Sequence, residues 1–407
     1  MKRVVVTGMG AVTPLGCTVS EFWSNAVNGV NGIDDITYFD CSESKYKLAG
    51  QVKGFDPTSC IEKSAVRKLD LFVQYALCSA QEAMYDSKID GTVDKEEFGV
   101  YYGSGIGGFN TLCTEHENFL TKGPRRVSPL FIPKMIYNMA AGNIAIRFGA
   151  TGPNMAISTA CATGTTCIGE AYRAIASGWA TAMICGGSEA AITPLTMAGF
   201  GNCLALTSAQ DKNAASLPFD KRRAGFVIGE GAGTLILEEY EHALKRGAKI
   251  YCEVCGYGST SDAYHVTAPD PEAVSTTRAI TKSLEGIAVE PSHIYINAHG
   301  TGTALNDKTE TVAIKKAFGD GAKNVHISST KSMTGHMLGA AGAVEAIAAI
   351  MALREGTVPP TINLNEPDEE CDLNYTPNVK VNADIEVALS TSLGFGGHNA
   401  CIAFKKV

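Results

Sequence analysis

One segment of the chain is small and apolar on nearly every side. Residues 339–350 read Gly-Ala-Ala-Gly-Ala-Val-Glu-Ala-Ile-Ala-Ala-Ile, with a single charged side chain. A helix that is hydrophobic all round has to be buried. The segment therefore predicts a helix enclosed between layers of other structure, and its alanines and glycines allow neighbouring backbone to approach closely.

Two parts of the sequence also show the same succession of predicted elements. An apolar run, a turn and a small-residue helix occupy residues 154–177, and the same succession returns at 326–354. A second pair of similar segments, 100–105 and 295–300, has an apolar strand running into a Gly turn. We infer two similar halves, 1–250 and 251–407, fused face to face with a buried helix from each at the centre. No Pro- or Ser-rich linker separates them, so we expect the halves to be packed rather than hinged.

Short apolar runs alternate with helical patterns along the first half. Strand-like residues 3–7 and 98–102 flank helical patterns near 19–28 and 69–86. Such alternation is typical of βαβ units and predicts the α/β class, with a mostly parallel sheet covered by helices.

Composition excludes several function classes. With 45% hydrophobic and 19% charged residues among 407, the chain is typical of a globular protein. Its net charge of −8 argues against nucleic acid as a partner, because a nucleic-acid binder needs a basic face. Residues 1–8 predict a first strand and not a signal peptide. No run approaches the roughly 18 apolar residues of a membrane span, so we expect a soluble, cytoplasmic protein.

The cysteines are scattered. There are 13 of them, an odd number, which in a long chain of this kind predicts reduced thiols rather than a disulfide framework. Cys252 and Cys255 form a lone CxxC within a strand-like run, without the second pair that a zinc site requires. We therefore expect no metal site.

Three distant segments carry reactive side chains. Cys161 lies where an apolar stretch breaks into small residues before a helix predicted at 165–177, and the positive end of that helix favours a thiolate. Taken alone, Cys161 also fits a small buried hydrophobe. His299 lies in a Gly/Thr-rich turn, and Lys331 and His336 lie in a Ser/Thr/Gly-rich turn. Each turn follows an apolar run, and such turns lie at the carboxyl ends of strands, where α/β proteins build their sites.

These segments and several others resemble a known family over the whole chain. The matching motifs are Val4-Val5-Val6-Thr7-Gly8-Met9-Gly10, the Cys161 turn, Pro218-Phe219-Asp220 with Gly229-Glu230-Gly231-Ala232-Gly233, the His299 turn, the Lys331/His336 turn, and Leu393-Gly394-Phe395-Gly396-Gly397-His398-Asn399. In their order and completeness they resemble the beta-ketoacyl-acyl carrier protein synthases of the thiolase superfamily, most closely the stand-alone synthase II type.

The resemblance implies a five-layered αβαβα fold of two similar halves with mixed sheets and buried central helices, and a homodimer. It implies elongation of an acyl chain by two carbons with malonyl-acyl carrier protein. No cofactor is expected, because phosphopantetheine arrives on the carrier protein. A structural monovalent cation in the C-terminal half stays an open alternative.

The chemistry of joining two thioesters fits these residues. A nucleophile must hold one acyl group while the other thioester supplies a carbanion equivalent. Cys161 is the expected nucleophile, and the backbone amides of Cys161 and Phe395 are, by resemblance, the expected oxyanion donors. His299 and His336 are expected to stabilise the enolate that forms when carbon dioxide leaves malonyl.

Supporting charged groups surround these residues. Lys331 either adds positive potential or organises the site through a carboxylate such as Glu310, and a plain structural ion pair is the alternative. Asp307 and Glu345 are expected to be supporting groups.

Other residues are candidates for contacts with substrate. Thr301 and Thr303 offer hydroxyls to a phosphopantetheine arm, and they also fit a pair of turn-stabilising threonines. Ile106, flanked by glycines, is expected to gate an apolar channel. The aromatic side chains that by resemblance line or gate the acyl route, or else belong to the core, are Phe131, Phe200 and Phe395.

The carrier protein is acidic in this family, so docking on an acidic chain needs a local basic patch. The candidates are Lys63, Arg67, Lys68, Arg125 and Arg126. At Leu204 the family often has a basic residue, so docking here relies on fewer charges.

Three alternative functions stay open. The first is a ketosynthase of an aromatic polyketide or aryl polyene cluster, which shares the same machinery. The second is a non-enzymatic chain-length partner subunit, but such partners lack the active cysteine that Cys161 supplies. The third is a degradative thiolase, which uses a second cysteine near the carboxyl end, where residues 394–397 hold none.

Overall fold

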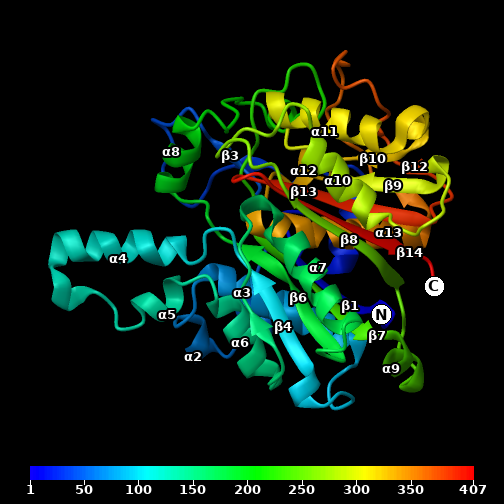
Figure 1. Cartoon of the computed structure of the whole chain (residues 1–407). Coiled ribbons are helices and arrows are strands. Elements are labelled where there is room, and N and C mark those ends of the chain that lie inside the picture. The colour runs from blue at the N-terminus through cyan, green and yellow to red at the C-terminus, as the bar shows by residue number, and fades with distance from the viewer.

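Ten strands form one sheet in the order β10-β9-β13-β14-β8-β1-β7-β6-β4-β5 (Figure 1). The computed structural model describes residues 1–407. The ten strands are β1 (Val4–Val12), β4 (Phe98–Gly103), β5 (Asn154–Met155), β6 (Ala182–Glu189), β7 (Gly231–Glu239), β8 (Cys252–Ser261), β9 (Ile294–Asn297), β10 (His326–Ser328), β13 (Val387–Gly394) and β14 (His398–Lys405). Two short ladders lie apart from it, β2 (Asp34–Asp35) with β3 (Leu48–Ala49) and β11 (Thr357–Val358) with β12 (Val381–Asn382).

The sheet consists of two five-stranded sets with the same internal order. Strands β5, β4, β6, β7 and β1 succeed one another as β10, β9, β13, β14 and β8 do. The two sets meet where β1 and β8 pair over three residues, Val4 to Val6. The repeat that the sequence predicted is thus present in the strand order.

The prediction of a mostly parallel sheet is wrong. Only β4–β5, β4–β6, β9–β10 and β9–β13 are parallel, and the other five ladders of the sheet are antiparallel. One reason is visible between β13 and β14, which are joined by residues 395–397 alone. So short a connection cannot make the crossover that a parallel pair requires.

The helices complete a five-layered αβαβα arrangement. Helices α7 (Thr163–Ala176) and α13 (Ala341–Glu355) pack on each other and on strands of both sets, which makes them the central layer. Helices α3 (Leu71–Ser87) and α6 (Met139–Phe148) cover the first set, and α10 (Val274–Ser283) and α11 (Ala304–Phe318) cover the second. The remaining helices are α1 (Val19–Val27), α2 (Lys63–Val66), α4 (Phe109–Lys122), α5 (Phe131–Met135), α8 (Pro194–Asn202), α9 (Tyr240–Lys245) and α12 (Lys331–Thr334).

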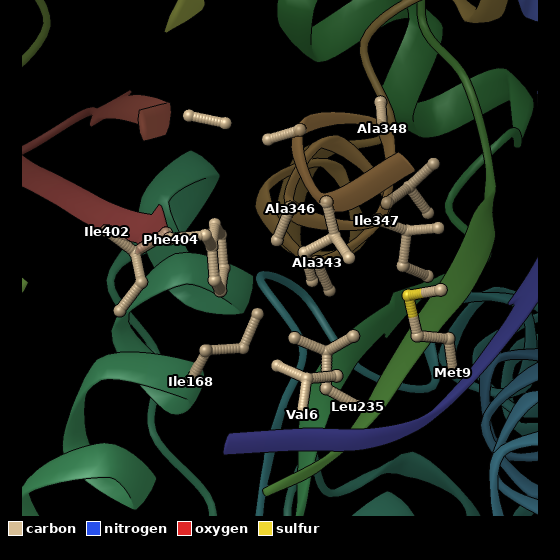
Figure 2. Packing of buried hydrophobic residues seen from close by; sticks show 14 of the residues in the cluster. Val6, Met9, Ile168, Leu235, Ala343, Ala346, Ile347, Ala348, Ile402 and Phe404 are labelled. Atoms are coloured by element: carbon tan, nitrogen blue, oxygen red, sulfur yellow. The ribbon is translucent and has the colours of Figure 1, made fainter. Parts of the chain in front are cut away.

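The central layer is as tightly packed as the small-residue helix predicted. Figure 2 shows Ala343, Ala346 and Ile347 of α13 facing Leu235 and other core side chains, all of them fully buried. A Cβ added at Gly164 would lie 2.5 Å from the backbone nitrogen of Ala343, so α7 and α13 approach more closely than any larger side chain would allow. Each buried Ile or Leu of this core contributes about 1.5–3 kcal/mol.

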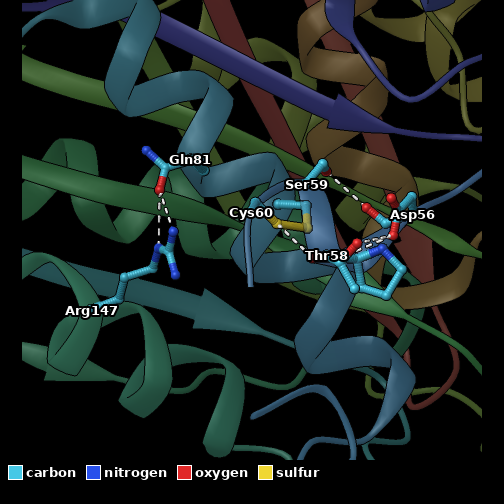
Figure 3. The surroundings of a disulfide bond; sticks show 8 residues. Asp56, Thr58, Ser59, Cys60, Gln81 and Arg147 are labelled. Atoms are coloured by element: carbon cyan, nitrogen blue, oxygen red, sulfur yellow. Dashed lines mark hydrogen bonds between the residues drawn. A yellow bond between two sulfur atoms is a disulfide. The ribbon is translucent and has the colours of Figure 1, made fainter. Parts of the chain in front are cut away.

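One cysteine pair departs from the expectation of reduced thiols. Cys60 and Cys78 form a disulfide with their Cα atoms 5.7 Å apart (Figure 3). A 3-10 turn at Pro57–Ser59, capped by Asp56, brings Cys60 against helix α3. Tertiary packing creates this proximity, and a sequence separation of 18 does not reveal it. The other eleven cysteines are free.

Helices α4 and α5 extend away from the rest of the first half (Figure 1). Phe119, Leu120 and Ile132 are exposed on this extension. The corresponding link in the second half, between β9 and β10, contains only α11 and a 3-10 segment. None of the helices combines the length and apolar character needed to cross a bilayer.

Candidate active site

A cavity of about 290 Å³ opens where turns from both halves meet. Cys161 comes from the first half, and His299 and His336 come from the second. The cavity is lined by Cys161, Phe200, Cys203, Leu204, Ala205, Phe226, Asp262, Thr267, Ala268, Pro269, His299, Thr301, Thr303, Ala304, Leu305, Asn306, His336, Leu393, Gly394, Phe395, Gly397 and Asn399. Cys161 thus shares one space with two histidines that lie more than a hundred positions further along the chain.

The Cys161 turn is a 3-10 segment, Ala160–Ala162, that leads directly into α7. The strand before it is only the two residues of β5, so the expected strand-to-helix elbow is mostly an irregular turn. Ala160 has φ of 51°, a left-handed conformation that an alanine adopts at some cost. Gly394 lies against this turn, and a Cβ there would meet the Cys161 nitrogen at 3.2 Å, so the approach of β13 requires a glycine.

Burial favours the protonated form of the Cys161 thiol. It raises the pKa of Cys161 to about 12, against the opposing effect of the Lys331 charge and of the backbone N–H groups of Phe395 and Cys161. Glu189, a buried carboxylate nearby, raises it further. The expectation that the helix end lowers this pKa is therefore wrong, because desolvation outweighs the favourable dipoles.

The two imidazoles lie close together and are neutral. Their ring centroids are 5.3 Å apart with the rings nearly perpendicular, and both side chains are buried. Burial lowers the pKa of His299 and of His336 well below 6.5, and the nearby Lys331 charge adds to the effect in both. Phe226 packs edge-on against His336 with a centroid distance of 5.1 Å. Near neutral pH each ring thus has one N–H to donate.

Lys331 fixes the tautomer of His299. Its Nζ lies 3.4 Å from His299 Nδ1. An ammonium group can only donate, so Nδ1 accepts and the ring proton of His299 is on Nε2. Lys331 is buried and forms an ion pair with Glu345. Its carboxylate partner is therefore Glu345, and the alternative that named Glu310 is wrong.

Glu310 and Asp307 instead hold the backbone of the His299 turn. Glu310 accepts the N–H groups of His299 at 2.7 Å and Gly300 at 2.8 Å, and Asp307 accepts that of Gly302 at 3.2 Å. Burial raises the pKa of Glu310 to about 7, against these donors. Both carboxylates are on helix α11, which begins just after the turn, so helix and turn are fixed to each other.

Thr301 and Thr303 both stabilise their turn and line the cavity. Their hydroxyls lie 3.0 Å apart and hydrogen-bond each other, as turn-stabilising threonines do. Both residues also line the cavity. The two interpretations drawn from the sequence are therefore compatible.

The remaining sequence candidates separate into two groups. Phe200 and Phe395 line the cavity, and Ile106 packs in the same apolar cluster as Cys161 and Phe200 without lining it. Phe131 lies at the start of α5 on the extension, outside the cavity. The basic residues are exposed on or just after α2 and in the turn after α4, away from the cavity lining; they are Lys63, Arg67, Lys68, Arg125 and Arg126.

Sequence reasoning missed the loop at residues 262–269, four residues of which line the cavity: Asp262, Thr267, Ala268 and Pro269. Asp262 accepts a hydrogen bond from Asn399 Nδ2 at 2.6 Å, and Gly396 donates its N–H to the Val266 carbonyl at 2.7 Å. These contacts attach the loop to the turn that carries Phe395. The sequence offered one hint of this close approach, the adjacent glycines Gly396 and Gly397. In the structure both have positive φ.

Comparison with known proteins identifies the family. The model of the beta-ketoacyl synthase N-terminal domain matches residues 1–243, and that of the C-terminal domain matches residues 251–365. The chain is 52% identical to the 3-oxoacyl-[acyl-carrier-protein] synthase 2 of Synechocystis sp., over 100% of this chain and 98% of the relative. It is 49% identical to the protein of the same name from Staphylococcus aureus, with the same coverage.

The fold comparison agrees. A solved ketosynthase of a type II polyketide system, in complex with its acyl-carrier protein and bound to the hexaketide, superposes with a TM-score of 0.90. It is 37% identical and covers 100% of this chain and 99% of its own. Both family models, the full-length relatives and the five-layered fold lead to one statement: this chain belongs to the beta-ketoacyl synthase family.

Proposed function

We propose that this protein is a 3-oxoacyl-acyl carrier protein synthase that elongates fatty acyl chains by two carbons. The observation that carries the proposal is the meeting of Cys161, His299 and His336 in one cavity. The full-length similarity to proteins named 3-oxoacyl-[acyl-carrier-protein] synthase 2 supports the same reaction.

The first step transfers an acyl group to Cys161. Its sulfur attacks the thioester carbonyl, a new thioester forms, and the pantetheine sulfur leaves with the thiol proton. The raised pKa of Cys161 means that the resting group is a neutral thiol. Loss of its proton therefore has to accompany substrate binding or attack, and the N–H groups of Cys161 and Phe395 receive the charge that develops on the carbonyl oxygen.

The second step removes carbon dioxide from malonyl. The electrons of the breaking carbon–carbon bond move onto the thioester oxygen as an enolate. Two neutral N–H donors, from His299 Nε2 and from His336, can stabilise this oxygen without a metal. The enolate carbon then attacks the acyl carbonyl on Cys161, and collapse of the tetrahedral intermediate releases the 3-oxoacyl product and the Cys161 thiolate, which takes up a proton from solvent to restore the thiol.

The substrates reach the site on acyl carrier protein in this proposal. Five exposed basic residues, Lys63, Arg67, Lys68, Arg125 and Arg126, form no ion pair within the chain, which leaves their charges free for an acidic partner. The polyketide ketosynthase of similar fold was solved with its own acyl-carrier protein.

A homodimer is part of the proposal. Phe119, Leu120 and Ile132 are exposed on the α4–α5 extension, and Met155 is exposed on the edge strand β5. Apolar surface and a free sheet edge favour pairing with a second copy. Light scattering tests this, and a concentration-independent monomer would contradict it. The cytoplasmic location expected from the sequence stays a prediction.

We propose no organic cofactor, and the second half fits a monovalent cation. Glu345 Oε2 and Ser390 Oγ are buried oxygens without hydrogen-bond partners, and Ser390 lies beside Asn297 in the β9–β13 register. Carboxylate and hydroxyl oxygens of this kind are ligands that a hard cation takes, and the proposal places the cation beside them. A thermal midpoint that rises with potassium or sodium, but not with an equal concentration of choline, tests this fit.

The second candidate function is a ketosynthase of a type II polyketide or aryl polyene cluster, which the similar polyketide structure favours. The test offers the purified protein acyl-carrier substrates of graded length together with malonyl-carrier and identifies the products by mass. Saturated acyl carriers that each gain two carbons support the fatty acid proposal. Use of polyene or polyketide starters alone would support the alternative, and no condensation at all would refute both.

A further inference from the structure

Glu189 is a buried carboxylate that the reaction described above does not use. It ends strand β6 and is inaccessible to solvent. Four donors converge on it. Oε1 accepts from Ser104 Oγ at 2.8 Å and from the Ile106 N–H at 3.2 Å, and Oε2 accepts from the N–H groups of Gly105 at 2.9 Å and Gly339 at 3.0 Å.

These donors belong to two segments beside the site. Ser104, Gly105 and Ile106 form the turn after β4, and Gly339 lies three residues after His336. The Ser104 hydroxyl also accepts the N–H of Gly107 at 2.9 Å, which closes the turn. One carboxylate thus holds the Ile106 turn against the segment that carries His336.

The packing around the carboxylate requires glycine at two of these positions. A Cβ at Gly105 would lie 2.7 Å from Glu189 Oε2, and a Cβ at Gly339 would lie 2.9 Å from the same atom. The Cβ at Gly339 would also lie 2.3 Å from the Gly105 nitrogen. The two segments are therefore in direct backbone contact around the carboxylate.

The Ile106 side chain connects this arrangement to the acyl site. It packs in the apolar cluster that also includes Leu338, Phe200 and Cys161. Because its backbone N–H is fixed by Glu189, the position of the side chain relative to Cys161 depends on that carboxylate.

We propose that Glu189 is a positioning residue that sets acyl chain-length selectivity by holding the Ile106 turn beside Cys161. This inference rests on the proposed condensing function and deepens it. The substrate class concerned is the long-chain acyl thioester, whose hydrocarbon tail the proposal places along the apolar cluster that Ile106 shares with Cys161 and Phe200, whereas a malonyl group has no such tail.

The variant Glu189→Gln tests the role with little change of shape. A glutamine can keep its oxygen towards Gly105 and Gly339 and turn its NH₂ towards Ser104, whose hydroxyl oxygen can accept. The N–H of Ile106 then faces another N–H and loses its acceptor. The substitution therefore releases Ile106. The negative charge that it also removes near Cys161 acts on every acyl substrate alike and cancels in a ratio of two of them.

The measurement is the ratio of kcat/KM for palmitoyl-carrier to that for hexanoyl-carrier. We expect Glu189→Gln to raise this ratio about fivefold, the equivalent of one hydrogen bond. Release of carbon dioxide from malonyl-carrier should stay within about twofold of wild type. Ser104→Ala, which removes one donor and keeps the carboxylate, should shift the ratio in the same direction by a smaller factor.

Two controls separate positioning from general damage. Glu230→Gln makes the same chemical change at a buried carboxylate that accepts from Val52 N–H at 3.0 Å and does not line the cavity, and it should leave the ratio unchanged. In an Ile106→Ala background, Glu189→Gln should have no further effect on the ratio, because the side chain it positions is absent.

An unchanged ratio in both Glu189→Gln and Ser104→Ala would overturn the inference. So would an equal loss on all substrates, or a full effect that persists without the Ile106 side chain. A wild-type protein that extends neither carrier would instead refute the proposed condensing function, so the two failures can be told apart.

Discussion

The turn after β4 and the turn after β9 occupy equivalent places in the two halves, yet their side chains differ in kind. The β4 turn presents Ile106 among glycines, and the β9 turn presents His299. Both are held by a buried carboxylate that accepts backbone N–H groups, Glu189 in the first half and Glu310 in the second. The same framework thus supports an apolar side chain in one half and an imidazole that can donate a hydrogen bond in the other.

The second pair of turns differs in the same way. The turn after β5 carries Cys161 at the start of α7, and the turn after β10 carries Lys331 and His336 before α13. The proposed nucleophile belongs to the first half, and the two imidazoles and Lys331 belong to the second. Neither half has the whole site, which exists only because α7 and α13 pack together.

The nucleophile and the imidazoles should therefore be separable by mutation. Cys161→Ser should lower condensation by roughly 10³-fold or more, because a serine hydroxyl here lacks a base that could activate it. The imidazoles of the other half remain, so release of carbon dioxide from malonyl-carrier should persist. Radiolabelled gas and product mass measure the two steps. Condensation at the wild-type rate would remove Cys161 from its role.

Variants of the second half should show the opposite pattern, in which decarboxylation is lost and acyl transfer is kept. His299→Ala or His336→Ala should lower carbon dioxide release by about 10²–10³-fold, the usual loss for one oxyanion donor. Transfer of an acyl group to Cys161 should continue, and intact-protein mass detects it. His326→Ala is the matched control, since this histidine lies on β10 outside the cavity. Normal gas evolution by both variants would contradict the assignment.

Lys331 has no equivalent in the first half. The two halves can therefore also be compared by removing this lysine and measuring the free energy of unfolding. Lys331→Met leaves Glu345 as a buried, unpaired charge and should cost about 3–5 kcal/mol of unfolding free energy. The double variant with Glu345→Leu should regain much of this. Lys308→Met, which breaks an exposed pair with Glu370, should cost about 0–1 kcal/mol. Urea titration gives all values, and equal losses for both lysines would contradict the argument.

Docking should depend on charges of the first half. Arg67→Glu combined with Arg125→Glu should raise KM for acyl-carrier substrates roughly tenfold through lost charge complementarity, with malonyl-CoA use unchanged. Lys323→Glu on the second half is the charge-matched control. Equal effects on the carrier and CoA substrates would argue against docking at this patch.

A more gradual effect is expected from the neutral imidazoles, as a dependence of stability on pH. In the unfolded chain His336 takes up a proton near pH 6.5, whereas burial keeps it neutral in the folded protein well below that value. Stability should therefore fall as pH drops below 6.5, by at most about 1.4 kcal/mol per pH unit for each such histidine. In His336→Asn this loss should be smaller. Thermal midpoints between pH 7 and 5 measure it, and parallel curves would contradict it.

Local sequence patterns were sufficient to predict part of this structure. The small-residue helix of 339–350 and the repeated strand-turn-helix segments were visible because burial on all sides and backbone contact leave a compositional signal. The turns with Cys161, His299 and His336 could be found because each follows an apolar run.

The remainder depends on contacts that sequence spacing does not encode. Both Glu310 and Glu345 were available to Lys331, and only the packing of α13 decides for Glu345. The Cys60–Cys78 pair and the antiparallel ladders likewise follow from tertiary arrangement. The raised pKa of Cys161 follows from burial, which a helix-end argument from sequence leaves out.

The central claim is that groups from the two halves act on one acyl thioester at Cys161. Its most direct test incubates the purified protein with octanoyl-carrier, then adds malonyl-carrier, and follows the peptide that contains Cys161 by mass spectrometry. The account predicts an octanoyl adduct on Cys161 that is discharged into a 3-oxoacyl-carrier two carbons longer, with one carbon dioxide per product. No adduct on that peptide, or one that malonyl-carrier leaves in place, would contradict it.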